Sequence, residues 1–151
     1  MIEQLEAIMA IMAEAFDPHW GEGWNTAQVL GSLQFPRTHV LIVDPAGQEW
    51  RAGSPAAGFL LSRDAPGEEE LLLVAVRPQY RRKGLGGILL EGFLAQARAR
   101  GAEKVFLEMR ENNEAGRLYR AHGFQPIGKR TKYYTCSDGS RLDAITFGRP
   151  V

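Results

Sequence analysis

A basic, glycine-rich turn is the part of this sequence best suited to chemistry. Six consecutive apolar residues, Leu71–Val76, end at an Arg-Pro pair, and the turn at 81–87 leads into a helical apolar periodicity. The first turn of a helix has free backbone N–H groups and the positive end of the helix dipole. Glycines let a ligand approach the backbone closely. The sequence therefore predicts a seat for a phosphate or pyrophosphate on the backbone of Arg82–Gly87.

The spacing within the turn separates it from two common phosphate-binding motifs. Neither the dinucleotide fingerprint G-x-G-x-x-G nor the Walker pattern G-x-x-x-x-G-K-[ST] is present. The pattern R-x-x-G-x-G, at Arg81, Gly84 and Gly86, resembles the acyl-CoA pyrophosphate motif of GNAT acetyltransferases. The alternative is a loop with ordinary helix-start glycines and solvated arginines. The placement of the motif between an apolar strand and an amphipathic helix favours the acyl-CoA interpretation.

A second group of chemically capable residues lies downstream, in the segment 107–124. This segment resembles the GNAT segment in which a strand ends in L-E-[VM] and is followed by Asn, L-Y and G-F. More narrowly, it is similar to that of the bacterial ribosomal-protein-alanine N-acetyltransferases of the RimI type. The resemblance covers about Leu41 to Phe147. The matching pieces are Leu107-Glu108-Met109, Asn112 and Asn113, Leu118-Tyr119, Gly123-Phe124, Glu70–Val76, Gly128–Arg130, Tyr133-Tyr134 and Asp143–Ile145.

The resemblance implies a role for each polar group of the reaction. A protonated amine cannot attack a thioester, so a base must take its proton directly or through water, and a departing thiolate benefits from an acid. Glu108 is then the base and Tyr119 the acid, while the backbone N–H of Val76 polarises the thioester carbonyl. The co-substrate is acetyl-CoA. Its implied contacts are Val74, Ala75, Val76, Arg81, Arg82, Lys83, Gly84, Leu85, Gly86, Gly87 and Asn113.

Several of these assignments keep an alternative. Glu69 or Glu70 could supply the base through a water molecule, which would leave Glu108 as a solvated carboxylate at a strand end. Tyr119 could simply pack against its neighbours. Asn112 has the spacing to the tyrosine that many GNAT enzymes show, whereas Asn113 has the expected distance from the glutamate. Either asparagine could also be only a helix N-cap.

The elements that must position these residues follow from the periodicity of apolar residues. Helical spacing predicts helices from Glu3 to about Phe16, from Asn25 to about Leu33, from Leu85 to the stop at Gly101, and over Glu114–Ala121. Asp64–Gly67 is expected to form a short turn and residues 137–139 a hairpin turn. The expected strands are Thr38–Val43, Ala57–Ser62, Leu71–Val76, Val105–Met109, Phe124–Thr135 and Arg141–Phe147.

This order of elements predicts an α/β (α+β) fold. The strand–helix–strand unit from Leu71 to Met109 should be a right-handed crossover between parallel strands. The resemblance implies the GNAT fold, with a mixed central sheet of about six strands flanked by about four helices, and residues 1–151 read as a single acetyltransferase domain. GNAT proteins often begin with a strand before the first helix. Here helical spacing begins at Ile2, so that strand is expected to be absent or very short.

Four aromatic residues are candidates for the walls of an acceptor site. Trp20 and Trp24 lie between the first two predicted helices, where GNAT proteins usually build the substrate lip, and they could equally be core packing. Tyr133 and Tyr134 could close the other side of a peptide groove. Because successive side chains of a strand alternate in direction, one of the two tyrosines is expected in the core.

Composition narrows the class of protein and its partners. The 151 residues suit one domain, and 18 basic residues balance 18 acidic ones, so bulk charge indicates neither a nucleic-acid nor a membrane partner. A lone Cys136 excludes an internal disulfide, the three histidines show no metal-binding spacing, and no metal is expected. The residues 1–16 do not resemble a signal peptide, so a cytoplasmic location is expected.

The acceptor expected from the resemblance is a protein or peptide N-terminus. The leading substrate is the N-terminal alanine of a small-subunit ribosomal protein. The glycine-rich motif does not distinguish this acceptor from a lysine, a polyamine, an amino acid or an antibiotic. A module that binds acyl-CoA without turnover is a further alternative, although such a module would need neither Glu108 nor Tyr119.

Overall fold

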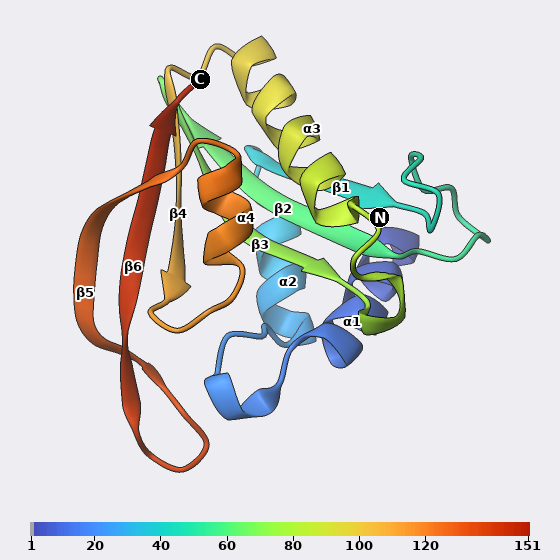
Figure 1. Ribbon diagram of the computed structural model, residues 1–151. Helices are drawn as coiled ribbons and strands as arrows, with labels where there is room; N and C mark the ends of the chain where they lie inside the picture. Colours follow the sequence, from blue (N-terminus) through green and yellow to red (C-terminus); the bar gives the residue numbers. More distant parts are fainter. Residues whose placement is uncertain (1) are drawn as a thin grey trace.

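The computed structural model describes residues 2–151, and in this part of the chain a mixed six-stranded sheet carries helices on both faces (Figure 1). The α-helices are α1 (Ile2–Ala15), α2 (Thr26–Leu33), α3 (Leu85–Ala99) and α4 (Gly116–Ala121), with short 3-10 turns at Pro18–Trp20 and Pro78–Tyr80. The strands are β1 (Thr38–Val43), β2 (Gly58–Ala65), β3 (Glu68–Val76), β4 (Lys104–Arg110), β5 (Gln125–Thr135) and β6 (Arg141–Pro150). Within residues 2–151, no helix has the length and apolar character of a membrane span.

The order of strands places the crossover unit at the centre of the sheet. The order is β1-β2-β3-β4-β6-β5, and β3–β4 is the parallel pair while the other neighbours are antiparallel. The helix α3 connects the two parallel strands, as the sequence predicted for residues 71–109. The predicted mixed sheet is therefore confirmed.

Two apolar clusters cover the two faces of the sheet. One cluster packs α3 and α4 against the sheet and includes Leu71, Phe93 and Phe147. The other packs α1 and α2 against the opposite face and includes Ile8 and Phe59. Burial on both faces explains why β3 is a continuous apolar run rather than an alternating one.

A β-bulge at Leu72 changes which face the residues of β3 present. Leu61 of β2 lies opposite Leu73 and Ser62 lies opposite Leu71, so Leu72 is an extra residue between them. Leu71 and Val74 both pack in the α3–α4 cluster, whereas Leu73 packs in the α1–α2 cluster. A bulge also bends its strand. This bend lies at the point where β3 leaves β4.

Element boundaries differ from the sequence prediction in a few places. The strand β2 continues through Asp64 and Ala65, because these residues pair with the start of β3, so the predicted turn shortens to Pro66-Gly67. The helix α4 begins at Gly116 rather than Glu114. Asn25 caps α2 through a capping box with Gln28, which confirms the predicted start of that helix.

Candidate active site

A cleft opens where the two central strands separate. The pairing of β3 with β4 runs from Glu68–Lys104 to Leu71–Leu107 and ends there. Figure 1 shows the two strands diverging beyond this point, with α3 and α4 on one side of the opening and the α1–α2 connection on the other. The resulting cavity has a volume of about 1390 Å³. Its lining includes most of the residues that the sequence predicted for the site, among them Glu108, Tyr119, Asn112, Asn113, Val74–Val76, Arg81, Arg82 and Gly84–Gly87.

The edge of β3 that faces the cleft offers backbone groups to a ligand. The N–H of Arg77 donates to the carbonyl of Ala57, the residue just before β2. Because N–H groups alternate in direction along a strand, those of Val74 and Val76 point away from β2 and toward the cleft. An extended ligand that carries amides can pair with such an edge as an added strand. The arrangement fits the predicted contact with the pantetheine arm of CoA.

The turn before α3 presents a row of free backbone amides. Arg82 has φ 64° and Gly84 has φ 79°, so two nearby residues adopt the left-handed conformation. In the part of the chain that the structure describes, the backbone N–H groups of 82–87 donate no hydrogen bond, and the first helical bond runs from the N–H of Ile88 to the carbonyl of Gly84. Successive free amides of this kind at a helix N-terminus form an anion-binding concavity. The geometry fits a diphosphate.

Two basic residues of the motif have contacts outside this concavity. The guanidinium of Arg81 donates to the carbonyls of Val76 and Ala15, both at 3.1 Å, and so ties the turn to β3 and to the end of α1. Lys83 is not among the lining residues, and its ammonium lies 5.8 Å from the Tyr80 ring centre. Arg81 therefore anchors the turn while it also lines the cavity, whereas Lys83 lies outside the lining.

Helix packing, as well as close approach of a ligand, favours glycine at position 86. A Cβ at this position would lie 3.1 Å from Leu118 on α4. Such a contact is tighter than ordinary van der Waals packing, so glycine here lets α3 and α4 approach each other. A substitution at Gly86 would disturb this packing together with any ligand. Gly84 separates the two effects better, because a Cβ there would meet nothing within 4 Å.

We expect Gly84→Asp to weaken CoA binding by at least about 10-fold relative to Gly84→Asn, because a carboxylate repels a diphosphate and an amide does not. Asn and Asp have nearly the same shape, and both tolerate positive φ better than other side chains with a Cβ. The measurement is CoA affinity by calorimetry, with circular dichroism to verify folding. Equal affinities of the two variants would contradict the diphosphate seat.

Two carboxylates approach each other at the mouth of the splay. Glu108 lies on β4 just beyond the last parallel pair, and its Oε1 is 3.0 Å from Nε of Arg130 on β5. Glu70 lies on β3 and also lines the cavity. Burial, and then the charge of Glu108, raises the pKa of Glu70 above its ordinary value. Two acid–base groups in different environments thus face the same cavity.

Glu69 is committed elsewhere. Its carboxylate is fully buried, receives two hydrogen bonds from Arg100 at 2.8 and 2.7 Å, and accepts a third from Ser62. It does not line the cavity. Of the two alternative bases that the sequence left open, only Glu70 is therefore placed to meet a substrate.

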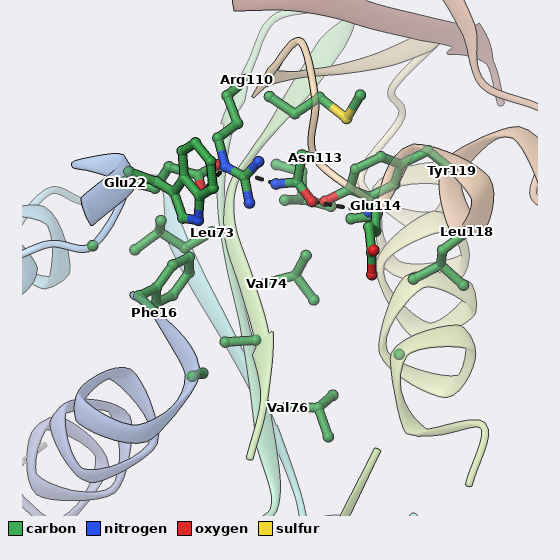
Figure 2. A pocket seen from close by; sticks show the side chains of 18 of the residues that line it. Phe16, Glu22, Leu73, Val74, Val76, Arg110, Asn113, Glu114, Leu118 and Tyr119 are labelled. Atoms are coloured by element: carbon green, nitrogen blue, oxygen red, sulfur yellow. Dashed lines mark hydrogen bonds and ion pairs between the residues drawn. The ribbon is translucent and has the colours of Figure 1, made fainter. Parts of the chain in front are cut away.

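Tyr119 reaches the cavity from the core side. Its ring packs on Phe124 and Phe147, with centroids 6.0 and 6.2 Å away. Figure 2 shows it extending from α4 toward Asn113 at the cavity. Burial, and then the charge of Glu22, raises the pKa of the Tyr119 phenol above its ordinary value. The phenol therefore stays protonated at neutral pH and remains a hydrogen-bond donor.

A further carboxylate, that of Glu22 in the α1–α2 connection, also lines the cavity, and the sequence did not predict it. Glu22 accepts a hydrogen bond from Arg110 at 2.7 Å and one from Asn113 at 3.1 Å (Figure 2). Arg110 also lies 4.0 Å from the ring centre of Trp20 and donates to Asn112. Sequence distance hid this contact, because Glu22 and Arg110 are 88 positions apart. Glu22-Gly23 lies in a predicted loop, and nothing in its local sequence indicated the contact with Arg110.

The two asparagines now have distinct surroundings. Asn113 accepts from the backbone N–H of Ala115 at 2.9 Å, in the turn before α4, while its amide nitrogen donates to Glu22. Asn112 accepts from Arg110. Both line the cavity. Figure 2 places the Asn113 side chain between Glu22 and Tyr119, where a ligand in the cleft would meet it.

The four candidate aromatic residues all line the cavity, and one of them also packs against the core. Trp20 and Trp24 both line the cavity, and Trp24 also packs on the α1–α2 cluster. Tyr133 and Tyr134 line the cavity together, with ring centroids 5.2 Å apart, so the expectation that one of them is core was wrong. An irregularity of β5 between Arg130 and Tyr134 breaks the strand alternation on which that expectation depended. Burial raises the pKa of Tyr134 to about 12.

Comparison with known proteins agrees with this geometry. Residues 5–124 match the acetyltransferase (GNAT) family. The chain belongs to this family. Among solved structures, the ribosomal-protein-S18-alanine N-acetyltransferase from Escherichia coli superposes with a TM-score of 0.81 at 30% identity, over 97% of this chain and 87% of that one. The GNAT fold predicted from the sequence is confirmed.

Curated relatives of this GNAT chain carry names of one kind. A [Ribosomal protein bS18]-alanine N-acetyltransferase from Escherichia coli is 38% identical over 96 residues, which are 63% of this chain and 64% of the relative. An N-alpha-acetyltransferase RimI from Mycobacterium tuberculosis is 38% identical over 131 residues, which are 83% of this chain and 75% of the relative. The chain thus spans slightly less than two thirds of the length of the Escherichia coli relative in sequence alignment.

Proposed function

We propose that this GNAT protein transfers the acetyl group of acetyl-CoA to the N-terminal α-amine of a protein, with the alanine of a small-subunit ribosomal protein as the leading acceptor. The observation that carries the transfer reaction is the cleft at the β3–β4 splay, which joins a free strand edge, a row of free amides and two carboxylates in one cavity. The names of the relatives support the choice of acceptor. We place the reaction in the cytoplasm, where acetyl-CoA and newly made ribosomal proteins are available.

Two parts of the cleft suit two parts of acetyl-CoA, its diphosphate and its pantetheine arm. The free amides of 82–87 would hold its diphosphate, and the strand edge at Val74–Val76 would pair with its pantetheine arm. The thioester then supplies an activated acetyl group near Val76. The N–H of Val76, directed into the cleft, would stabilise negative charge that develops on the thioester oxygen.

Proton transfer is assigned to three side chains of the cavity. Glu108 would take the proton of the attacking amine, directly or through water. Glu70 lies close enough for the charge of Glu108 to contribute to its raised pKa, so it remains the alternative base of the cavity. Tyr119, which remains protonated, would donate to the departing thiolate.

The two carboxylates are expected to respond differently to amide substitution. Glu108→Gln should lower kcat/KM about 10²-fold or more, because the base is lost. Glu70→Gln should lower it less and should raise the melting temperature near pH 7. The folded state holds the proton of Glu70 more tightly than the unfolded state does, so this carboxyl favours folding below its unfolded pKa. That contribution is lost as the pH rises through its raised folded pKa.

The measurements are a pH profile of kcat/KM and thermal melts at pH 4 and pH 7 for both variants. The stabilising effect of Glu70→Gln should appear at pH 7 and be much smaller at pH 4, where the carboxyl is mostly protonated in both states. A larger loss of activity in Glu70→Gln than in Glu108→Gln would transfer the role of base to Glu70.

A panel of acceptors tests the proposed function. Purified protein is incubated with acetyl-CoA and peptides that begin with alanine, and mass spectrometry locates the acetyl group. Matched peptides with a blocked N-terminus and an internal lysine distinguish α-amine from side-chain acetylation. Acetylation of lysine, polyamines or antibiotics alone would overturn the proposed acceptor, but the protein would still be an acetyltransferase. Binding of CoA with no transfer to any amine would leave only a binding module.

A further inference from the structure

A group of three potential metal ligands lies beside the cleft and has no role in acetyl transfer. One ligand atom each of His19, Cys136 and Asp138 lies within 4.8 Å of the others. His19 belongs to the 3-10 turn after α1, whereas the other two residues lie in the connection between β5 and β6. The fold therefore brings together side chains that are more than 110 positions apart, as the separation of 118 between His19 and Ser137 shows.

Backbone contacts hold the two segments in register at this point. The N–H of Ser137 donates to the carbonyl of His19 at 2.8 Å. A Cβ at Gly21 would lie only 2.7 Å from the carbonyl oxygen of Thr135, so the chains approach as closely as glycine allows. The three side chains thus converge on a framework that the backbone fixes. Ligands fixed in this way lose less freedom when a metal binds.

The surroundings of each side chain suit a ligand. The imidazole Nδ1 of His19 contacts Oγ of Ser137 at 2.8 Å, which leaves Nε2 with a free lone pair when Nδ1 donates. Asp138 accepts two hydrogen bonds from Ser140 on Oδ1, at 2.9 and 2.6 Å, and among residues 2–151 its other oxygen accepts none. The thiol of Cys136 is buried and free of any disulfide.

We infer that His19, Cys136 and Asp138 form a binding site for a divalent metal ion of the zinc type. Thiolate sulfur, imidazole nitrogen and carboxylate oxygen are the donors that Zn²⁺ takes in proteins, and three protein ligands leave the fourth tetrahedral position for water. A bound ion would cross-link the segment of Trp20 to that of Thr135, both of which line the cleft. The inference needs no part of the proposed acetyl transfer.

The test is direct Zn²⁺ binding by the purified, metal-stripped protein, measured by calorimetry with Zn²⁺ alone. We expect one site per chain, weakened at least about 10-fold by Cys136→Ser and by His19→Ala. His122→Ala is the matched control, because His122 also pairs with a carboxylate, Glu91, but lies away from the group. Zn²⁺ should also raise the melting temperature of the wild type and not that of Cys136→Ser.

Co²⁺ provides an independent readout of the sulfur ligand. The cobalt-loaded wild type should show thiolate-to-cobalt charge-transfer absorption, and Cys136→Ser should lose it while its circular dichroism spectrum stays unchanged. Absence of Zn²⁺ binding in the wild type would overturn the site. So would binding that Cys136→Ser and His19→Ala leave intact.

Discussion

Tyr119→Phe is expected to lower kcat about 10²-fold and to leave CoA affinity within about 3-fold of the wild type. The substitution removes one hydroxyl and keeps the ring, whose contacts with Phe124 and Phe147 hold α4 on the sheet. Among the residues that the structure describes, the hydroxyl makes no hydrogen bond to another protein group, so its removal leaves no protein partner unpaired. The loss should therefore appear in turnover rather than in folding or binding.

Steady-state kinetics with saturating acetyl-CoA, together with calorimetry for CoA, measure the effect. Tyr133→Phe is the control, because it makes the same chemical change on a half-exposed ring that also lines the cavity. The raised pKa of Tyr119 adds a second expectation: its ionisation should cause no fall in wild-type activity between pH 7 and the ordinary tyrosine pKa of about 10. Full activity of Tyr119→Phe would remove the phenol from the mechanism.

Arg100→Leu is expected to destabilise the protein by about 3 kcal/mol, because it leaves the carboxylate of Glu69 buried without its charged partner. Glu69 is 0% exposed, and Arg100 supplies two of its three hydrogen bonds. We choose the low end of the range for buried pairs, since the Arg100 side chain is 26% exposed and water can enter in its place. The melting temperature should fall by about 6–12 °C.

Arg98→Leu is the matched control for that substitution. It removes the same charge from the same end of α3, but Arg98 is exposed and forms no ion pair among the described residues. The double variant Glu69→Gln/Arg100→Leu should recover part of the stability, because the uncompensated charge is gone. Urea unfolding of all three variants provides the free energies of unfolding. Equal effects of Arg100→Leu and Arg98→Leu would refute the buried pair as a source of stability.

Local signals in the sequence were sufficient for the framework and for the cofactor half of the site. Apolar periodicity reports which side chains meet the core, so the strand Thr38–Val43 was predicted at its observed bounds and α1, α2 and α3 within a few residues. The glycine-rich turn is contiguous in sequence. The free amides at the helix start were predicted from these residues, whereas the positive φ of Arg82 was not, because residues with a Cβ rarely adopt it.

Strand irregularities were beyond the reach of periodicity. The bulge at Leu72 inserts one extra residue, and in β5 the three residues between Arg130 and Tyr134 lie opposite Asp143 alone, so two of them are extra. Both depend on pairing with a neighbouring strand. As a result the sequence could not show that Tyr133 and Tyr134 share the cavity, or that Leu71 and Val74 share one face.

Contacts between segments that are far apart in the sequence were also determined only by the tertiary structure. The sequence alone determined that the turn at Arg82–Gly87 leads into a helix with free amides and that Glu108 lies near the end of a strand, because each depends on neighbours along the chain. It did not reveal that Glu22 would accept hydrogen bonds from Arg110 and Asn113. Nor did it reveal that Arg100 would form an ion pair with Glu69, or that His19 would lie beside Cys136. These contacts depend on how the α1–α2 connection and the β5–β6 hairpin fold over the two sides of the splay. A contact between residues far apart in sequence is fixed by the packing of whole elements, and no local pattern encodes it.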